Sequence, residues 1–291
     1  MCKALAFLKT MRPKQWTKNG VIFAALIFDE KLLQWPYLWR TIVGFLLFCL
    51  ISGVVYTIND VADLERDRQH PRKRNRPLAS GQLSPQIAII AAVFIAIVAL
   101  IAGVALDPLF VLILAGYLLL QITYSFVLKH VVLLDVMAIA AGFVLRVAAG
   151  VPLVDAERFS PWLFICMTLL ALFLGLGKRR GELALLGGEA ANHRASLEEY
   201  NFALLDQLIS IVTAAIIVAY AFYTFSAPNL PTGHWMMLTI PFVIYALFRY
   251  MYLIHVKGIT QAPDEVVLTD RPLQIGFLLW GAAAMTILYF G

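Results

Sequence analysis

The chain has 291 residues, of which 61% are hydrophobic and only 14% are charged, and its formal net charge is +5. Its mean hydropathy is +0.81. A soluble domain of this length needs a far more polar surface, so the composition excludes that class and indicates an integral membrane protein. The three cysteines, Cys2, Cys49 and Cys166, are scattered and predict neither a disulfide framework nor a metal site.

Apolar runs of about 17 to 25 residues, the length that a bilayer core requires, recur along the chain. We expect an all-α, polytopic membrane protein with about nine transmembrane helices in a single domain over residues 1–291. The expected spans are residues 18–34, 39–58, 85–106, 109–127, 131–151, 161–177, 206–226, 235–254 and 273–290.

Most basic residues lie on one side of the membrane in this expected topology. Only three, Lys31, Arg40 and Arg158, lie on the other side. The positive-inside rule then predicts a cytoplasmic N-terminus and a C-terminus on the opposite side of the plasma membrane. The three longer connections, residues 59–84, 178–205 and 255–272, share the cytoplasmic face, where we expect the chemistry. The positive charge is explained by topology, so no nucleic-acid partner is expected. The N-terminus lacks the apolar core of a signal peptide, and we expect no processing.

The most unusual segment follows the second expected span, where Asn59, Asp60, Asp63 and Asp67 form the pattern N-D-x-x-D-x-x-x-D. On a continuous helix the three carboxylates fall within about 60° of one another, on one side. Such a group suits Mg²⁺, which binds one or two carboxylates together with substrate phosphate oxygens. The alternative is a solvated, self-neutralising loop, because a run of basic residues follows directly. The pattern alone leaves both readings open.

Further polar groups border other spans on the same face. Taken singly, each is consistent with a positive-inside flank or an interfacial anchor; they are Lys14, Gln15, Lys18 and Asn19 in "RPKQWTKN", Tyr124 and Lys129 in "YSFVLKH", and Lys178, Arg179, Arg180 and Glu182 in "GKRRGEL". Together they place an acid cluster among several cations, which suits a substrate with several phosphates. Asp135, near the cytoplasmic end of the fifth span, is a candidate wall of the site, whereas Arg146 lies deeper and is expected to be structural. Small residues in "AIAAGFVLRVAAG" indicate close helix packing, which permits a homo-oligomer.

In order along the chain, "RPKQWTKN", "NDVADLERDRQHPRKRNRPLASG", "YSFVLKHVVLLD", "FVLRVAAG", "GKRRGEL", "SLEEY" and "PDEVVLTDRPLQ" resemble the UbiA superfamily of intramembrane prenyltransferases. Among its branches the sequence is most similar to the decaprenyl-phosphate phosphoribosyltransferases. Aromatic prenyltransferases of the superfamily carry a second acidic motif, D-x-x-x-D, after the sixth span. Here that place reads Lys178-Arg179-Arg180-Gly181-Glu182, which agrees with a substrate pair rich in phosphate.

The resemblance implies transfer of phosphoribose from phosphoribosyl pyrophosphate to a polyprenyl phosphate, releasing pyrophosphate, for cell-wall arabinan synthesis. It implies that Asn59, Asp60, Asp63 and Asp67 hold Mg²⁺, with Lys178 as a further catalytic group. The implied substrate-binding residues are Tyr56, Asn59, Lys73, Arg76, Tyr124, Lys129, Asp135, Arg179, Arg180, Glu182, Lys14, Gln15, Lys18 and Asn19. An aromatic prenyltransferase that uses a prenyl diphosphate is the nearest alternative. A transporter is the other alternative; it would have internal repeats and charges at the membrane midplane, but the sequence shows no repeat and Arg146 is its one plausible midplane charge.

Overall fold

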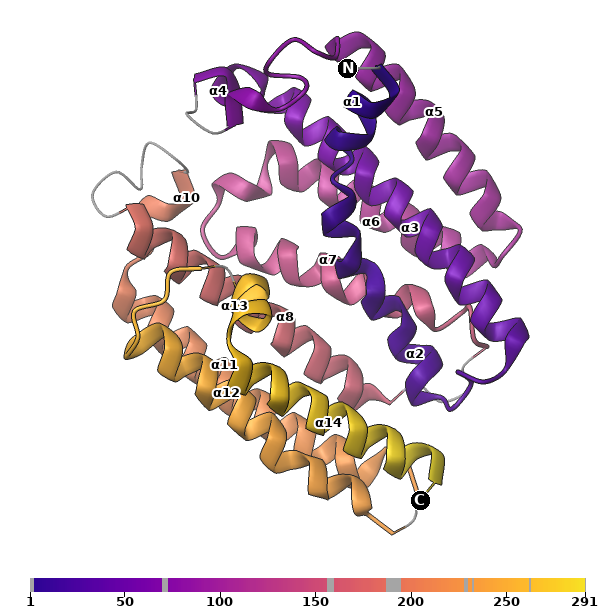
Figure 1. Ribbon diagram of the computed structural model, residues 1–291, viewed down its shortest axis with the longest axis vertical. Coiled ribbons are helices and arrows are strands. Elements are labelled where there is room, and N and C mark those ends of the chain that lie inside the picture. Colours follow the sequence, from indigo (N-terminus) through magenta and orange to yellow (C-terminus); the bar gives the residue numbers. More distant parts are fainter. Residues whose placement is uncertain are drawn as a thin grey trace. The chain divides into compact units, whose positions relative to one another are not determined.

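The computed structural model describes residues 3–69, 73–155, 160–186, 195–227, 230–231, 233–261 and 263–290. These residues form helices joined by short connections, and no strand occurs among them. The helices, shown in Figure 1, are α1 (Lys3–Thr10), η1 (Pro13–Ile22), α2 (Phe23–Phe28), α3 (Trp35–Ala62), α4 (Leu64–Gln69), η2 (Lys73–Asn75), α5 (Pro85–Val104), α6 (Pro108–Phe126), η3 (Leu128–His130), α7 (Leu134–Gly150), α8 (Pro161–Leu186), α10 (Ala195–Glu198), α11 (Phe202–Ser226), η5 (Trp235–Thr239), α12 (Ile240–His255), α13 (Pro263–Thr269) and α14 (Arg271–Phe290).

Seven helices within the described residues are long and apolar enough to cross a membrane, and they coincide with seven of the nine expected spans. The expected first span is instead η1, a 3₁₀ helix, followed by the short helix α2, which ends before the polar residues Asp29 to Lys31. The expected fifth span corresponds to α7, which has 17 residues. The protein is therefore an all-α, multi-pass membrane protein, but the count of nine spans is not confirmed.

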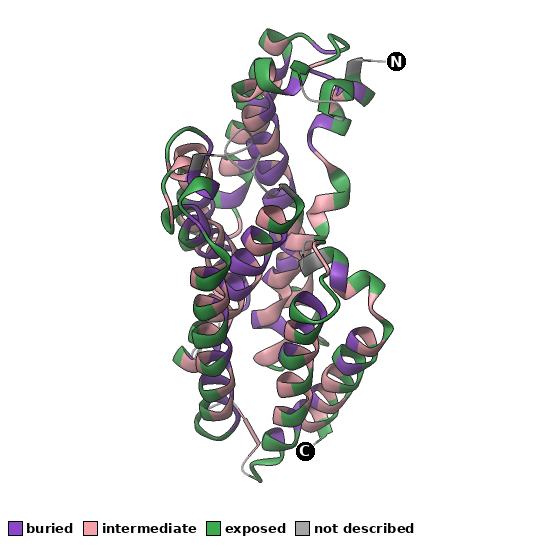
Figure 2. Cartoon of the chain, turned by 90° about the vertical axis from the view of Figure 1, so that its left-hand side faces the viewer, coloured by how far each residue is buried: buried purple, intermediate pink, exposed green. Residues whose placement is uncertain are grey.

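Helix α5 illustrates how these helices suit a lipid environment. Ile90, Phe94, Ile97 and Ile101 follow one helical face and are all at least half exposed. The opposite face carries the small buried residues Ala88, Ala92, Ala99 and Gly103. Figure 2 shows buried and exposed positions on the long helices throughout. Because an apolar stripe of this length would be costly in water, the exposed face of α5 fits the acyl chains of a bilayer.

The chain divides into two compact units, and α7 contributes to both of them. Unit 1 comprises residues 1–128 and 145–156. In it α3 packs against α5 and α6, and the N-terminal arm, which we define as residues 3–28, runs along α3 (Figure 1). Phe48, Phe110 and Leu114 are fully buried in its main apolar cluster. Pro85 and Pro108 begin α5 and α6. Proline suits this first position because the N–H that it lacks would have no hydrogen-bond partner within the helix.

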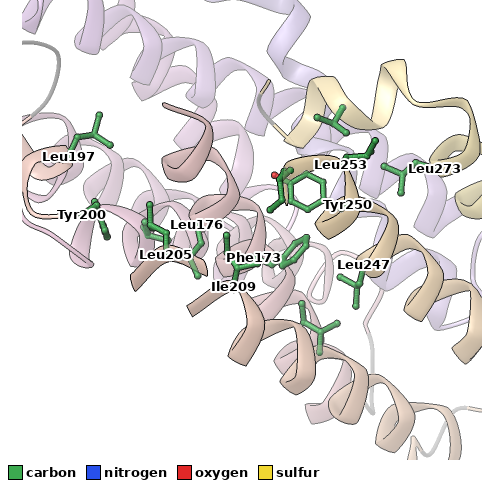
Figure 3. Packing of buried hydrophobic residues seen from close by; sticks show 14 residues of the cluster. Phe173, Leu176, Leu197, Tyr200, Leu205, Ile209, Leu247, Tyr250, Leu253 and Leu273 are labelled. Carbon is green, nitrogen blue, oxygen red and sulfur yellow. The ribbon is translucent and has the colours of Figure 1, made fainter. Parts of the chain in front are cut away.

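Unit 2 comprises residues 129–144 and 157–291. Helices α8 and α11 pack against each other along their lengths, and α12 packs against α14. Figure 3 shows the apolar cluster that these helices share, in which Phe173 and Leu176 of α8 lie close to Ile209 of α11 and Tyr250 of α12. Gly177 permits this approach, since a Cβ there would lie 2.3 Å from the hydroxyl of Tyr250.

Candidate functional site

The acidic motif of unit 1 lies where α3 ends and α4 begins. Helix α3 stops at Ala62, and Asp63 is its C-cap, with its N–H bonded to the carbonyl of Asn59 at 3.0 Å. A short helix, α4, follows and carries Asp67. The condition under which the three carboxylates would share one side, a continuous helix, is therefore not met. The break separates Asp63, which accepts a hydrogen bond from the Asn59 amide at 3.3 Å, from the two buried acids.

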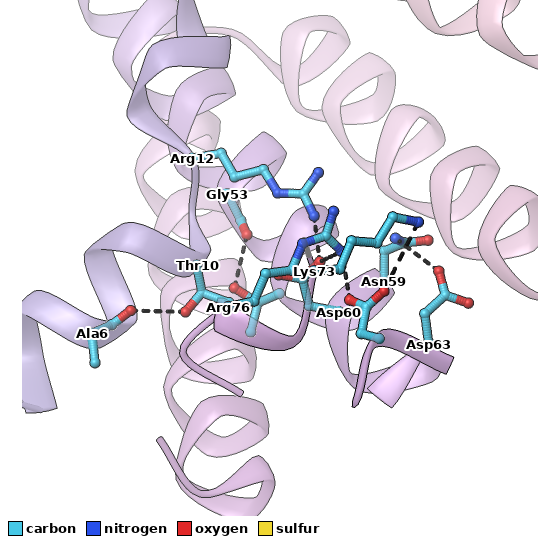
Figure 4. Close-up of polar contacts among 11 residues, drawn as sticks. Ala6, Thr10, Arg12, Gly53, Asn59, Asp60, Asp63, Lys73 and Arg76 are labelled. Carbon is cyan, nitrogen blue, oxygen red and sulfur yellow. Dashed lines mark hydrogen bonds and ion pairs between the residues drawn. The ribbon is translucent and has the colours of Figure 1, made fainter. Parts of the chain in front are cut away.

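Asp60 and Asp67 form an ion-paired group with Arg12 and Arg76, which we call the acid–guanidinium cluster. Arg76 Nη1 donates to Asp60 Oδ1 at 3.1 Å and to Asp67 Oδ2 at 2.5 Å. Arg12 Nη2 donates to the same Oδ1 of Asp60. Lys73 Nζ lies 4.0 Å from Asp67 Oδ1. Figure 4 shows Arg12 and Arg76 directed at Asp60, with Lys73, Asn59 and Asp63 nearby.

Burial differs sharply between the two signs of charge in this cluster. The carboxylates of Asp60 and Asp67 are each 3% exposed, whereas Arg12 and Arg76 are 28% and 27% exposed. The guanidinium groups therefore separate the acids from solvent and compensate their charge, as buried carboxylates require. A polyanion that approaches from water would meet the cations first.

The two carboxylates also converge on a single point, because one nitrogen, Arg76 Nη1, lies within hydrogen-bond distance of both. Hard oxygen donors of this kind are the ligands that Mg²⁺ prefers, usually one or two of them with phosphate oxygens completing the shell. The described part of the chain contains no group of three or more His, Cys, Asp or Glu side chains arranged around a metal position. The pair Asp60 and Asp67 thus fits a metal that is shared with a substrate.

Arg12 is the member of the cluster that the sequence did not indicate as a site residue. Its side chain comes from the turn between α1 and η1, and its Cζ lies 4.9 Å above the ring of Tyr56, a cation–π contact. Tyr56 itself was predicted to bind substrate. The available signal is the position of Arg12 at the start of "RPKQWTKN", directly before the four predicted substrate-binding residues of that motif.

The four predicted substrate-binding residues of this motif lie in η1 and have different environments. Lys14 is exposed and Gln15 and Lys18 are partly exposed, so all three remain accessible. Asn19 is 1% exposed, and its Oδ1 accepts from Arg146 Nε at 2.7 Å. The side chain of Asn19 is thus buried within unit 1, and its predicted headgroup contact stays a prediction. Arg146 also donates to the Tyr117 hydroxyl at 2.6 Å, which agrees with its expected structural role.

Tyr124 and Lys129 follow the same stretch of chain but belong to different units. Tyr124 lies on α6 and is partly buried, and Lys129 lies in η3 and is 8% exposed. The predicted roles of these two residues in orienting the ribose or the acceptor stay predictions.

Unit 2 contains a second polar group, centred on Asp135, which we call the Asp135 cluster. Asp135 accepts from Arg179 Nε at 2.7 Å, from the Tyr200 hydroxyl at 2.8 Å and from Ser196 Oγ at 3.2 Å. Asp135 and Arg179 are both 0% exposed. Burial and the hydrogen bond to Asp135 raise the pKa of Tyr200, so its hydroxyl stays protonated and donates.

This environment bears on two predictions, which stay predictions. Asp135 was expected to line the site and Arg179 to clamp a phosphate, but each is buried and paired with the other. Arg179 Nη1 also binds Glu182, one turn further along α8. Glu182, a predicted substrate-binding residue, is thus held by Arg179. The cluster ties α8 to the start of α7 and to the segment of Ser196 and Tyr200.

The other basic residues of "GKRRGEL" face different partners. Arg180 Nε donates to Asp206 at 2.6 Å, and Nη1 donates to the carbonyl of Ile254 at 3.1 Å. Its expected role as a phosphate clamp would require these contacts to break. Lys178 is exposed and is the most accessible member of this basic triplet. Residues 187–194 of the expected functional segment 178–205 lie outside the described residues.

The fold and these polar clusters define an all-α, multi-pass membrane protein with buried charge at helix ends. Residues 21–263 match the model of the UbiA prenyltransferase family, and the chain belongs to that family. Its helical arrangement is also similar to the structure of a UbiA homolog from Archaeoglobus fulgidus bound to GPP and Mg²⁺. That similarity has a TM-score of 0.76 at 19% identity and covers 97% of this chain and 99% of the other.

Two enzymes are similar to this chain over nearly its whole length. The decaprenyl-phosphate phosphoribosyltransferase of Mycolicibacterium smegmatis is 35% identical, over 97% of this chain and 92% of the relative. The enzyme of the same name from Corynebacterium glutamicum is 34% identical, over 94% of this chain and 83% of the relative.

Proposed function

We propose that this protein transfers the 5-phosphoribosyl group of phosphoribosyl pyrophosphate to a polyprenyl phosphate and releases pyrophosphate. The observation that carries the proposal is the 35% identity, over 97% of the chain, to an enzyme named decaprenyl-phosphate phosphoribosyltransferase. The acid–guanidinium cluster supports it independently, since partly exposed guanidinium groups beside paired carboxylates suit a substrate that carries phosphate and binds metal.

Asp60 and Asp67 are the residues that we infer to hold Mg²⁺, with Asn59 and Asp63 beside them. The donor chemistry and the convergence of Asp60 and Asp67 on one nitrogen fit such an ion. When bound, Mg²⁺ neutralises negative charge on the pyrophosphate. Arg76 and Lys73, which contact these carboxylates, would bind phosphate oxygens. Lys178 is a further residue that we infer to bind phosphate.

The reaction exchanges one C–O bond for another at C1 of the ribose. An oxygen of the polyprenyl phosphate forms a bond to C1, and the bond from C1 to the pyrophosphate oxygen breaks with its electron pair. Cationic side chains favour the negative charge that develops on the leaving pyrophosphate. The acceptor phosphate is already ionised at neutral pH, so no proton has to be removed and no general base is assigned.

The orientation in the membrane follows from the same charges. We infer that the N-terminal arm and the acid–guanidinium cluster face the cytoplasm in the plasma membrane. Lys3, Lys9 and the basic residues after Asp60 support this placement through the positive-inside rule. Labelling of single cysteines introduced at Lys14 and Lys31 with a membrane-impermeant reagent in intact cells tests it; only the cysteine at position 31 should react.

A two-donor assay tests the function. The detergent-purified protein receives either phosphoribosyl pyrophosphate with a polyprenyl phosphate, or a prenyl diphosphate with 4-hydroxybenzoate, each with Mg²⁺ and each with EDTA. Mass spectrometry should detect a lipid-linked phosphoribose in the first mixture only, and EDTA should abolish it. A prenylated benzoate as the sole product would instead assign the protein to the aromatic prenyltransferases.

A further inference from the structure

We propose that Arg12 exchanges partners during substrate binding: its guanidinium pairs with Asp60 in the ligand-free protein and moves to the pyrophosphate when metal reaches the carboxylates. This inference rests on the proposed function and deepens it, because it adds a substrate-binding residue from the N-terminal arm. The same exchange applies to Arg76, which was already a predicted phosphate ligand.

The N-terminal arm holds Arg12 in place by packing along one face of α3. Gly53, Tyr56 and Asp60 lie at positions i, i+3 and i+7 of that helix, so they share a face. Met11 packs on Gly53, where a Cβ would lie 2.5 Å from the methionine side chain. Arg12, the next residue, covers Tyr56 and reaches Asp60. The absence of a side chain at Gly53 thus lets the arm lie close enough for this contact.

The backbone of Arg12 is itself unusual. Its φ of 52° and ψ of 63° place it in the left-handed region, which residues other than glycine rarely adopt. The N–H of Arg12 bonds to the carbonyl of Lys9, and its carbonyl accepts from the N–H of Gln15. Contacts on both sides therefore hold a conformation that directs the side chain back over α3.

The difference in exposure gives the direction of the exchange. Asp60 is 3% exposed beneath Arg12, which is 28% exposed. A metal ion cannot reach the Asp60 oxygen shared by both arginines unless at least one guanidinium moves. A pyrophosphate that arrives with the metal offers each guanidinium a new charged acceptor, so the lost ion pair is replaced by a similar one.

A purely structural role predicts something different. If Arg12 only fastens the N-terminal arm to α3, its removal should loosen the acid cluster and weaken every ligand of that cluster together. Partner exchange instead predicts opposite effects on two ligands, because Arg12 competes with the metal but assists the pyrophosphate.

Two binding measurements on the full-length protein in detergent separate these roles. Mn²⁺ binding without phosphate is followed by the loss of the electron paramagnetic resonance signal of the free ion. Binding of inorganic pyrophosphate with Mg²⁺ is followed by calorimetry. Arg12→Gln should strengthen Mn²⁺ binding several-fold, and it should weaken pyrophosphate binding about tenfold, the loss expected for one charge-assisted hydrogen bond.

Arg12→Lys keeps the charge but loses the planar fork, so it should leave Mn²⁺ binding unchanged and weaken pyrophosphate binding. Arg68→Gln is the matched control, since Arg68 is exposed on α4, pairs with Glu65 at 2.8 Å, and should change neither affinity. Weaker binding of both ligands by Arg12→Gln would overturn the proposal and leave Arg12 as a structural contact. If that variant does not fold, Arg12→Lys decides, because unchanged pyrophosphate binding contradicts partner exchange.

Failure of the proposed function would look different from failure of this inference. Wild-type protein that binds Mg²⁺ and pyrophosphate but forms no phosphoribosyl lipid would contradict the function and leave the exchange intact. Wild-type protein that forms the lipid while Arg12→Gln binds pyrophosphate normally would contradict the exchange alone.

Discussion

At the scale of single residues, the buried carboxylates of both polar clusters are paired with arginines in the ligand-free protein. Asp60 and Asp67 are held by Arg12 and Arg76, and Asp135 is held by Arg179. The two groups differ in one decisive respect. The arginines of the acid–guanidinium cluster are about a quarter exposed, whereas Arg179 is 0% exposed. We therefore propose that the first group exchanges partners with a ligand, and we expect the second to stabilise the fold.

Substitution of Asp135 by Asn tests the structural role of the Asp135 cluster. It leaves the Arg179 charge buried with one carboxylate fewer, and the loss of one partner of a buried ion pair costs about 3–5 kcal/mol. We therefore expect a clearly lower Tm in detergent. Glu198→Gln, at an exposed position of α10, is the control and should leave the Tm unchanged. An unchanged Tm for Asp135→Asn would restore Asp135 as a candidate substrate ligand.

Lys178 is expected to behave in the opposite way. It is exposed on α8, so Lys178→Gln should preserve the Tm while it weakens binding of phosphoribosyl pyrophosphate about tenfold, the loss of one charged hydrogen bond. Calorimetry on both proteins measures this. Equal affinities would return Lys178 to a purely topological role as a positive-inside residue.

At the scale of elements, the ends of the helices determine where charge is placed, and these ends were the least predictable feature. Hydrophobic runs located seven long helices, because burial in lipid requires them. The same runs could not distinguish η1 from a full span, since a 3₁₀ helix and an α-helix share an apolar composition. The break at Asp63 likewise left no signal in the periodicity, yet it separates Asp63 from Asp60 and Asp67.

Close packing of α8 provides a test at this scale. A Cβ at Gly181 would lie 2.6 Å from the carbonyl oxygen of Thr260, which is backbone and cannot rotate away. We expect Gly181→Ala to destabilise the protein by about 1–3 kcal/mol, as overpacking does. Gly116→Ala is the matched control, because nothing lies within 4 Å of a Cβ there. Thermal unfolding that ranked Gly116→Ala as the less stable variant would contradict the packing described here.

The link between α12 and α14 predicts a pH dependence. Asp270 accepts two hydrogen bonds from Arg249 and one from the N–H of Leu273 at the start of α14. The Arg249 contact lowers the pKa of Asp270 below its ordinary value of 3.8. A lowered pKa means that this stabilisation is present above about pH 4 and is lost as the pH falls further.

Unfolding measured between pH 3 and pH 6 checks this expectation. Asp270→Asn should reduce stability near pH 6 and flatten the decline in stability toward pH 3. An equally steep acid decline in the variant would show that other carboxylates cause it.

At the scale of the whole molecule, the composition predicted a membrane protein and the motifs predicted the family. The contacts of individual side chains could be described only from the structure. High hydropathy and the order of the motifs are properties of the whole chain. Conclusions from them therefore hold even where the bounds of a single helix are predicted wrongly. The roles of Arg12, Asn19 and Arg179 depend on which way a side chain turns at a helix end. Sequence periodicity places such residues near a site without saying whether they face substrate or core.

Formation of lipid-linked phosphoribose by wild type and by Asp60→Asn tests the central claim most directly. Both proteins receive phosphoribosyl pyrophosphate, a polyprenyl phosphate and Mg²⁺, and the product is quantified by mass spectrometry at equal amounts of folded protein. The account predicts product from wild type and a loss of at least about a hundredfold in Asp60→Asn, because one carboxylate of the metal-binding pair is removed. Glu65→Gln, an exposed acid on α4, should retain full activity. Near-normal product from Asp60→Asn would contradict the account.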